Sequence, residues 1–451
     1  MGKKPNVIFL LTDQMRGQAT GYAGDPNVKT PHLDALARES IVFQNAISGM
    51  PVCSPARASM LTGKYPLTHG VFLNDVYLKP DENSIAKVFT RAGYDTAYIG
   101  KWHVDGHGCR SMFIPRERRQ GFDYWKVLEC THNYFESHYY GDGDEKLTWE
   151  GYDAFAQTRD AQEYIKEHDK ENPFFLFLSW GPPHAPYHLA PQEYLDMYDP
   201  GKIKLRPNVP KKHTKRARNN LAGYYAHITA LDECVGMVVQ TVKECKIDND
   251  TILVFYSDHG DMLFSQGHVK KQRPWEESLL CPFMIRYPAL LGRGSRTIEM
   301  PVNTTDVPAT LLGLCGIDTP SSYEGDDFSA ILKNEREELE DNPILISCPA
   351  PFGQFIRGKR YGGREYRGIR TIRYTYIRDL DGPWLLYDNK EDPYQLKNLC
   401  HKKGSKKVQE ELEAVLRTLL EKTGDEFLPA TEYIRKWNYK VDSRGTVPYT
   451  N

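Results

Sequence analysis

The sequence is organised around one stretch, Cys53-Ser54-Pro55-Ala56-Arg57-Ala58-Ser59-Met60-Leu61-Thr62-Gly63. Pro55 fixes one φ angle and removes a backbone donor, so the chain is already bent where it reaches this stretch. Residues Arg57 to Leu61 are then expected to start a helix, whose free N–H groups and positive dipole end favour an anion. Arg57 lies one turn after Cys53 and can hydrogen-bond to a group at position 53. A structural cysteine buried in a turn is the alternative that this stretch alone leaves open.

Working outward, four apolar runs predict buried strands at residues 5–13, 95–100, 173–180 and 251–256. Polar residues that could carry chemistry stand at the end of each run or shortly after it, namely Asp13 with Gln14, Lys101 with His103, His184, and Asp258 with His259. Helices are expected between the strands, at residues 30–37, 84–93, 152–170, 222–246 and 306–314, and a further short strand at 283–288. Strands that alternate with helices predict an α/β fold with a large, mostly parallel sheet covered on both faces. The polar residues then meet at one sheet edge, where open α/β sheets place ligands.

The pattern changes after the acidic run Glu335 to Asp341. Residues 366–376 alternate with period two, which predicts one half-exposed antiparallel strand that pairs with residues 385–388. A closing helix is expected at residues 406–422. We therefore predict a catalytic α/β domain over residues 1–342 and a smaller C-terminal α+β subdomain over 343–451.

Composition indicates a globular protein of ordinary type. The chain has 451 residues, 40% hydrophobic and 26% charged, with a formal net charge of −2. This balance favours neither nucleic acid nor a membrane as a partner, and it leaves the oligomeric state open. The apolar run Val7 to Leu11 is too short for a signal peptide. The sequence as written thus predicts a cytoplasmic protein, or a periplasmic or secreted one if a signal was trimmed.

The nine cysteines show no paired metal-ligand spacing. Four of them, Cys234, Cys245, Cys281 and Cys315, lie in apolar runs. We expect buried free thiols, which agrees with a reducing compartment.

Several separated motifs together resemble one family. They are Cys-x-Pro-x-Arg with Thr-Gly at Cys53, Gly-Lys-Trp-His ending at His103, Pro-His-x-Pro around His184, Asp258-His259-Gly260, Lys271, and the segment 392–399. From residue 5 to about residue 399 the chain resembles the type I, formylglycine-dependent sulfatases of the alkaline phosphatase superfamily. The resemblance implies an alkaline-phosphatase-like fold and sulfuric ester hydrolysis. It also implies that a formylglycine-generating or anaerobic sulfatase-maturating enzyme oxidises Cys53 to formylglycine.

The resemblance also implies roles for individual residues. One divalent cation, calcium first, would be held by Asp13, Gln14, Cys53 (as formylglycine), Asp258 and His259. The cation with Arg57, Lys101 and Lys271 would neutralise charge on the sulfate, while a hydroxyl of the aldehyde hydrate at position 53 attacks sulfur. His184, with Lys271 nearby, would protonate the leaving alcohol. His103 would take the proton of the second hydroxyl as sulfate leaves.

Two positions depart from the commonest sulfatase pattern. Gln14 and His259 stand where many sulfatases have Asp and Asn, and an imidazole suits manganese or zinc, with magnesium also possible. The same pairs occur in phosphonate monoester hydrolases and choline sulfatases, although the phosphonate enzymes generally lack the residues found here at 101 and 103. A phosphonate monoester or phosphodiester hydrolase is therefore the alternative activity. A third hypothesis is a non-catalytic binder of sulfated glycans in which Cys53 is unmodified.

The substrate is expected to be a sulfated carbohydrate, or else an aryl or alkyl sulfate. Candidate substrate-binding residues are Asn74, Arg110, Arg116 and Arg118. Sugar subsites could also involve the basic cluster Arg357 to Arg373 and the aromatic residues Tyr134, Phe135, Tyr139 and Tyr140. Residues 201–219 are expected to form an exposed basic loop.

Overall fold

The computed structural model describes residues 4–169, 171–351, 363–442 and 447 of the chain. Its main body is an eight-stranded sheet in the order β12-β2-β11-β9-β1-β8-β4-β5. Within this sheet only β11 runs antiparallel to its neighbours β9 and β2, and the other pairs are parallel. The expected mostly parallel sheet is confirmed. The strands span Asn6–Thr12 (β1), Ile41–Phe43 (β2), Asp95–Lys101 (β4), Tyr124–Leu128 (β5), Phe174–Ser179 (β8), Thr251–Ser257 (β9), Phe283–Arg286 (β11) and Arg296–Ile298 (β12).

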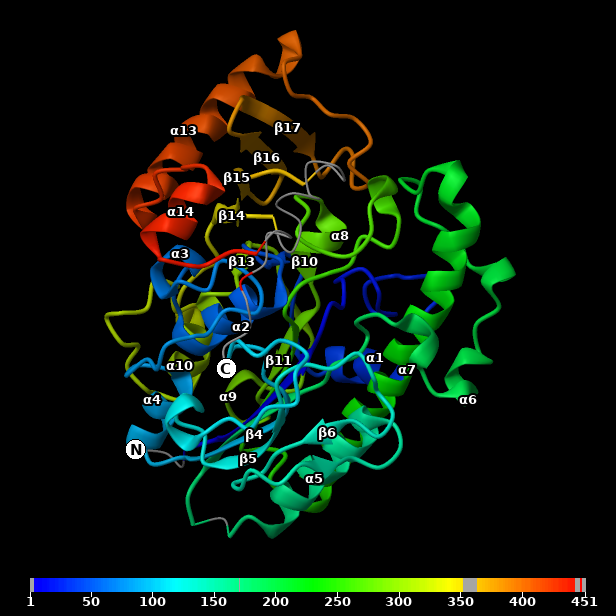
Figure 1. Ribbon diagram of the computed structural model, residues 1–451, viewed down its shortest axis with the longest axis vertical. Coiled ribbons are helices and arrows are strands. Elements are labelled where there is room, and N and C mark those ends of the chain that lie inside the picture. Colours follow the sequence, from blue (N-terminus) through cyan, green and yellow to red (C-terminus); the bar gives the residue numbers. More distant parts are fainter. Residues whose placement is uncertain (1–3, 170, 352–362, 443–446, 448–451) are drawn as a thin grey trace.

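Helices cover both faces of this sheet because its central strands are apolar on both sides. Along β1, Ile8 and Leu10 pack into one core cluster, while Val7 and Phe9 pack into the other. The first cluster lies under α1 (Pro31–Ala37), α5 (Asp153–Glu167) and α7 (Thr214–Glu244). The second lies under α2 (Cys53–Thr62), α4 (Ile85–Arg91) and α10 (Asp306–Leu314). Figure 1 shows these two groups of helices on opposite sides of the sheet.

Two small sheets and several short helices complete the structure around the main sheet. A three-stranded sheet joins β3 (Ala46–Ile47), β10 (Leu280–Cys281) and β13 (Val302–Asn303), and a two-stranded one joins β6 (His138–Tyr139) to β7 (Leu147–Thr148). The short helices are α3 (Pro66–His69), α6 (Gln192–Leu195), α8 (Glu276–Leu279), α9 (Pro288–Leu291), α11 (Ser329–Leu332) and α14 (Ala430–Lys436). None of the helices in the described residues is both long and apolar enough to cross a bilayer.

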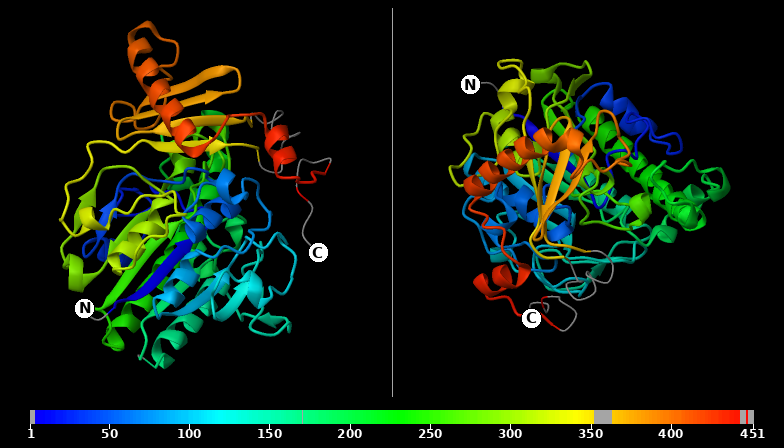
Figure 2. Two further views of the ribbon diagram at one scale, coloured as in Figure 1. Left: turned by 90° about the vertical axis from the view of Figure 1, so that its left-hand side faces the viewer. Right: turned by 90° about the horizontal axis from the view of Figure 1, so that it is seen from above.

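A second, antiparallel sheet sits at one end of the molecule (Figure 2, left). Its strands are β14 (Ile344–Cys348), β15 (Tyr366–Arg370), β16 (Tyr374–Asp379) and β17 (Gly382–Asp388), in that order. Helix α13 (Lys406–Thr423) packs on one face through Leu412 and Leu416. The other face shares a core cluster with Met262 and Leu279 of the main body. The smaller α+β part is thus present, and its boundary after residue 342 stays a prediction.

Three sequence predictions need correction. The strand expected over residues 366–376 is a hairpin, because Thr371 to Arg373 turn the chain between β15 and β16. The long helix starts at Thr214, so part of the expected basic loop is its first turns. Helix α2 begins at Cys53 rather than at Arg57, because Pro55 falls in its first turn, where the missing N–H is not needed.

Candidate active site

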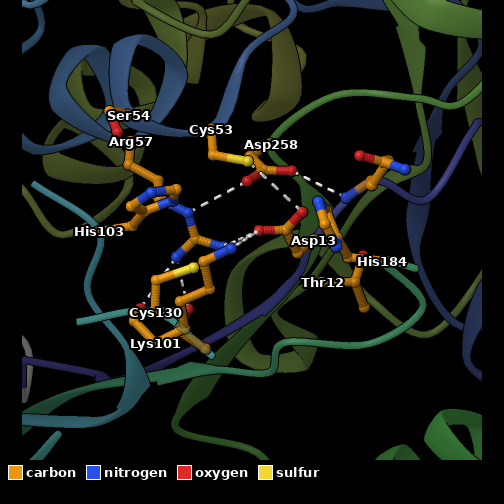
Figure 3. A network of polar contacts seen from close by, with 12 residues as sticks. Thr12, Asp13, Cys53, Ser54, Arg57, Lys101, His103, Cys130, His184 and Asp258 are labelled. Atoms are coloured by element: carbon orange, nitrogen blue, oxygen red, sulfur yellow. Dashed lines mark hydrogen bonds and ion pairs between the residues drawn. The ribbon is translucent and has the colours of Figure 1, made fainter. Parts of the chain in front are cut away.

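Four parallel strands end at one edge of the sheet and bring the predicted polar residues together. Asp13 follows β1, Lys101 ends β4, and Asp258 follows β9. His184 lies five residues beyond the end of β8. All four side chains are buried, and Figure 3 shows them around Cys53. The residues come from distant parts of the sequence, and the sheet topology alone makes them neighbours.

Cys53 is the first residue of α2 and lies at the centre of this group. Lys271 Nζ donates to its Sγ at 2.6 Å, and the Sγ lies 3.3 Å from His259 Nε2 and 3.6 Å from Asp13 Oδ1. Burial and Asp13 would raise the pKa of Cys53, but Lys271, Lys101 and His259 hold it well below its usual range. The surroundings therefore favour an electron-rich group at position 53.

The start of α2 is fixed by the segment that carries Asn74 and Asp75. The Ser54 N–H donates to Asn74 Oδ1 at 2.9 Å, and the Asp75 N–H donates to Ser54 Oγ at 3.2 Å. One of the backbone donors that the sequence predicted for an anion is thus already used by Asn74. The helix ends at Gly63, whose φ of 65° is left-handed.

Arg57 joins the two carboxylates of the site. Its Nη2 donates to Asp13 at 3.2 Å and its Nε to Asp258 at 3.1 Å. Its Nη1 donates to the carbonyl of Lys101 at 2.9 Å and to Ser179 Oγ at 2.8 Å. These bonds engage all three guanidinium nitrogens, so Arg57 sets the geometry of Asp13 and Asp258.

The two carboxylates differ in their electrostatics. Lys101 Nζ forms an ion pair with Asp13 at 2.6 Å. Burial would raise the pKa of Asp13, but Lys101 and His184, among other cationic groups, hold it well below its usual range. Burial and the charge of Asp13 raise the pKa of Asp258. Two acidic groups so close together favour a cation between them.

The donors around position 53 fit such a cation. Four candidate ligand atoms lie within 4.8 Å of one another, one each from Asp13, Cys53, Asp258 and His259. Gln14 Nε2 donates to Asp261 at 2.5 Å, which leaves Gln14 Oε1 buried without a hydrogen-bond partner in the described part of the chain. An orphaned buried amide oxygen beside two carboxylates is suited to a divalent metal. Asp261, which orients Gln14, was not among the predicted site residues, although it follows the Asp258-His259-Gly260 motif directly.

His103 has a partner that sequence reasoning missed. Its Nε2 lies 2.8 Å from Asp75 Oδ1, and its Nδ1 is buried without a regular hydrogen bond within the described residues. Burial lowers the pKa of His103, but Cys130, Asp75 and Cys53 raise it to about 10. Because Asp75 occupies Nε2, Nδ1 is the nitrogen left for chemistry. No local pattern around Asp75 signals this contact, since 28 residues separate the pair.

His184 is held by the backbone around it. Its Nδ1 lies 2.7 Å from the carbonyl of Ala185, and Tyr134 OH donates to the carbonyl of His184 at 2.6 Å. The ring stacks on His132 at 5.2 Å between centroids. Burial and Lys271 hold the pKa of His184 well below its usual range. The neutral ring therefore has only Nε2 available for a substrate.

The backbone of the site is locally strained. Left-handed φ angles occur at non-glycine residues 14, 75, 103, 270 and 272, with values of 68°, 59°, 61°, 62° and 59°. Such residues cluster at functional sites, where the surrounding structure holds them in place. Gly100, with φ of 104°, shows why glycine precedes Lys101, since a Cβ there would lie 2.1 Å from the carbonyl oxygen of Ser179.

A pocket of about 490 Å³ opens onto this group. Its lining includes Asn74, Asp75, Lys101, His103, Cys109, Cys130, His132, His184, Lys270, Lys271 and Arg273. Two larger hollows, of about 680 and 520 Å³, lie elsewhere among the described residues and contain none of the predicted catalytic side chains. The smaller pocket has a size typical of small-ligand sites, and Lys and Arg residues outnumber acidic residues in its lining.

The residues predicted to bind sugar lie in different places. Asn74 lines the pocket, whereas Arg110, Arg116 and Arg118 are not among its lining residues. Arg118 forms an ion pair with the buried Asp105 at 2.9 Å and stacks over Tyr77, and Arg116 pairs with Asp123. Tyr134 is fully buried beneath the site, while Arg357 lies outside the described residues. A substrate role for the three arginines stays a prediction.

Comparison with known proteins identifies this arrangement. The sulfatase family model matches residues 5–317, which is more than half of the chain. The chain belongs to the sulfatase family, and it is a sulfatase enzyme. A model for the C-terminal part of N-sulphoglucosamine sulphohydrolase matches residues 265–422. The resemblance predicted from the motifs is thereby confirmed.

Individual relatives agree with the family. The chain is 46% identical over 451 residues to an ulvan-active sulfatase of Formosa agariphila, covering 99% of this chain and 87% of that protein. It is 30% identical to an endo-4-O-sulfatase of Bacteroides thetaiotaomicron, covering 93% and 92%. A Bacteroides thetaiotaomicron structure solved in work on the metabolism of multiple glycosaminoglycans superposes with a TM-score of 0.85 at 28% identity, covering 96% and 99%. The phosphonate monoester hydrolase of Agrobacterium radiobacter shares the fold, with a TM-score of 0.76 at 21% identity over 99% and 100% of the two chains.

Proposed function

We propose that this sulfatase removes sulfate from a sulfated carbohydrate and that formylglycine formed from Cys53 carries the reaction. The observation that supports this most directly is the placement of Cys53, with Lys271 Nζ at 2.6 Å and a buried acidic and imidazole cluster on its other side. The Sγ marks the place of the formylglycine oxygen. An electron-rich oxygen there is stabilised by the charges that already lower the pKa of the thiol.

The proposed metal ligands are Asp13, Gln14, Asp258 and His259, together with residue 53. The orphaned Oε1 of Gln14 and the raised pKa of Asp258 support a cation at this place. Oxygen donors suit calcium, while the imidazole of His259 suits manganese or zinc, with magnesium also possible. When bound, the cation supplies positive charge that polarises the sulfate ester and activates the hydroxyl at residue 53.

The basic residues have separate tasks in this proposal. Lys271 is half-buried and contacts Cys53 directly, so its ammonium group can bind a sulfate oxygen. Lys101 is buried against Asp13 and adds a second fixed positive charge. Arg57 holds both carboxylates in place. Fixed charges of this kind stabilise the negative charge that develops on the sulfate without needing to reorganise.

The two histidines divide the proton transfers. His184 Nε2 would donate a proton to the leaving alcohol, because a bound sulfate raises the otherwise lowered pKa of this ring. His103 Nδ1 would accept a proton from residue 53 as sulfate leaves, and its Nε2–H donates to Asp75 during this step. The His103–Asp75 pair thus fixes the tautomer in the way that a carboxylate does in a catalytic triad.

The similarity to an ulvan-active sulfatase supports ulvan oligosaccharides as the first substrate class to examine. The pocket fits this proposal because its volume of about 490 Å³ suits a small number of sugar units and its wall carries Lys270 and Arg273. A maturation enzyme in the host would supply the oxidation of Cys53.

The deciding experiment measures sulfate release from ulvan oligosaccharides, sulfated monosaccharides and an aryl sulfate. Mass spectrometry first establishes the aldehyde at position 53, and Cys53→Ala serves as the blank. Release that is absent in the blank is the expected result. Turnover of an aryl phosphonate with no release from any sulfate ester, in aldehyde-containing protein, would instead favour the phosphonate hydrolase alternative.

A further inference from the structure

Two cysteines far apart in the sequence meet on the wall of the substrate pocket. Cys109 lies in the segment between β4 and β5, and Cys130 lies two residues beyond the end of β5. Their Sγ atoms are 3.3 Å apart, and Cys109 Sγ lies 3.6 Å from His132 Nδ1. All three candidate ligand atoms lie within 4.8 Å of one another. This cluster shares no residue with the cation site at Asp13.

The distances can be compared with those of a thiolate–imidazole metal site. Zinc lies about 2.3 Å from a cysteine sulfur and about 2.1 Å from a histidine nitrogen. With tetrahedral angles, these lengths place sulfur and nitrogen ligands about 3.6 Å apart and two sulfurs about 3.8 Å apart. The observed sulfur–nitrogen distance equals the first value, and the observed sulfur–sulfur distance of 3.3 Å is slightly shorter than the second.

We propose that Cys109, Cys130 and His132 bind a thiophilic divalent metal of the zinc class. A disulfide between the cysteines would need the two sulfurs to approach to about 2 Å. It would also not involve His132, whose Nδ1 lies beside Cys109 Sγ. Two thiolates and one imidazole suit zinc better than the oxygen-rich set at Asp13 does. The thiolate cluster is therefore expected to bind zinc more tightly than the Asp13 site.

The cluster is open to the substrate pocket, so a metal can enter, and it lies beside active-site residues. Cys109 and His132 are exposed, Cys130 is buried, and all three line the substrate pocket. With three protein ligands, the fourth position stays open to the pocket for water. The His132 ring stacks on His184 with an interplanar angle of 19°. Figure 3 shows Cys130 beside Lys101. A metal here would tie the 105–132 segment to His184 and Lys101 of the active site.

The test uses the Cys53→Ala protein, which removes the third thiol near the pocket and makes the readout independent of sulfatase activity. Cobalt(II) is added to the reduced, metal-free protein, and its absorption spectrum is recorded. The expected result is one thiolate-to-cobalt charge-transfer band with tetrahedral cobalt bands, and one zinc that competes for the site. Cys109→Ser and Cys130→Ser should each abolish the charge-transfer signal of bound cobalt or reduce it by half or more.

The remaining variants give the controls. His132→Gln should weaken zinc binding by about tenfold or more, whereas Cys245→Ser, on a half-buried cysteine outside the cluster, should change nothing. Circular dichroism checks that each variant is folded. The proposal is overturned if reduced protein gives no charge-transfer band, or if zinc displaces the cobalt charge-transfer band from His132→Gln at the same concentration as from its parent. A stable Cys109–Cys130 disulfide in protein purified without reductant, with no zinc bound after reduction, would overturn it as well.

Discussion

Replacement of Asp75 by Asn tests whether the His103–Asp75 pair serves catalysis. The change keeps the side-chain shape, and Asn tolerates the left-handed φ of 59° at this position. It removes the negative charge 2.8 Å from His103 Nε2 and replaces one acceptor with an N–H donor. A hydrogen bond to a charged group contributes about 1.5–3 kcal/mol. At about 1.4 kcal/mol for each factor of ten, kcat should fall about 10- to 150-fold.

The pH profile gives a second readout for the same variant. Asp75 is one of the groups that raise the pKa of His103, so its loss lowers that pKa. If His103 must be neutral to accept a proton, activity rises with pH through this pKa. The acidic limb of the kcat profile should therefore shift to lower pH in Asp75→Asn, while KM changes little.

The assay is initial-rate sulfate release on protein matched for aldehyde content, with thermal unfolding as the check on folding. Asn74→Asp is the neighbouring control, since it leaves the contact between Asp75 and His103 intact and changes the side chain that accepts a hydrogen bond from the Ser54 N–H. A kcat for Asp75→Asn within about threefold of wild type is a smaller loss than a hydrogen bond to a charged group predicts, and it would refute the assigned role. So would a loss confined to KM.

Three further predictions concern the two active-site lysines, the buried Asp153 and the metal site. Lys271→Ala should lower kcat by about 10²–10³ with little change in stability, because the hydrogen bond of its side chain within the described residues is to Cys53. Lys101→Ala should in addition destabilise the fold by about 3–5 kcal/mol, because it leaves Asp13 buried without its 2.6 Å partner. Urea unfolding of the two variants separates these effects. Burial raises the pKa of Asp153 to about 8 from the ordinary 3.8, so between these values the unfolded chain ionises while the folded one stays protonated. Stability is then greatest below pH 4 for this group and falls by about 1.4 kcal/mol per pH unit up to about pH 8; Asp153→Asn should remove this slope, and equal slopes in both proteins at pH 5–7 would contradict the assignment. Chelation should lower the midpoint of thermal unfolding, and Gln14→Ala should need more metal to restore it. Metal at 100 times its Kd should stabilise the folded protein by about 2.7 kcal/mol. A midpoint that chelator leaves unchanged in protein shown to contain metal would count against the site.

The sequence alone determined which segments become the central strands and which residues follow them. Apolar runs such as Val7–Leu11 form buried parallel strands because both faces of the sheet are covered, and the helix over residues 306–314 has the bounds its pattern predicts. The cysteine motif and the polar residues at the strand ends could be predicted from the sequence, because each depends on only a few adjacent residues. The chain's alternation of strands and helices then implied the shared sheet edge.

Only the tertiary structure decided which side chains act together. Arg57 of α2 bridges the carboxylates of Asp13 and Asp258, which follow separate strands. Asp75, in the segment after α3, reaches His103 beyond the end of β4. No local pattern encodes either contact. Arg118, read from sequence as a substrate residue, pairs with the buried Asp105. Cys109 and Cys130 meet across 21 residues, although their spacing shows no metal motif. Local periodicity fixes which face of an element is buried, whereas pairing across loops depends on how separate elements pack, and that is set by the whole chain.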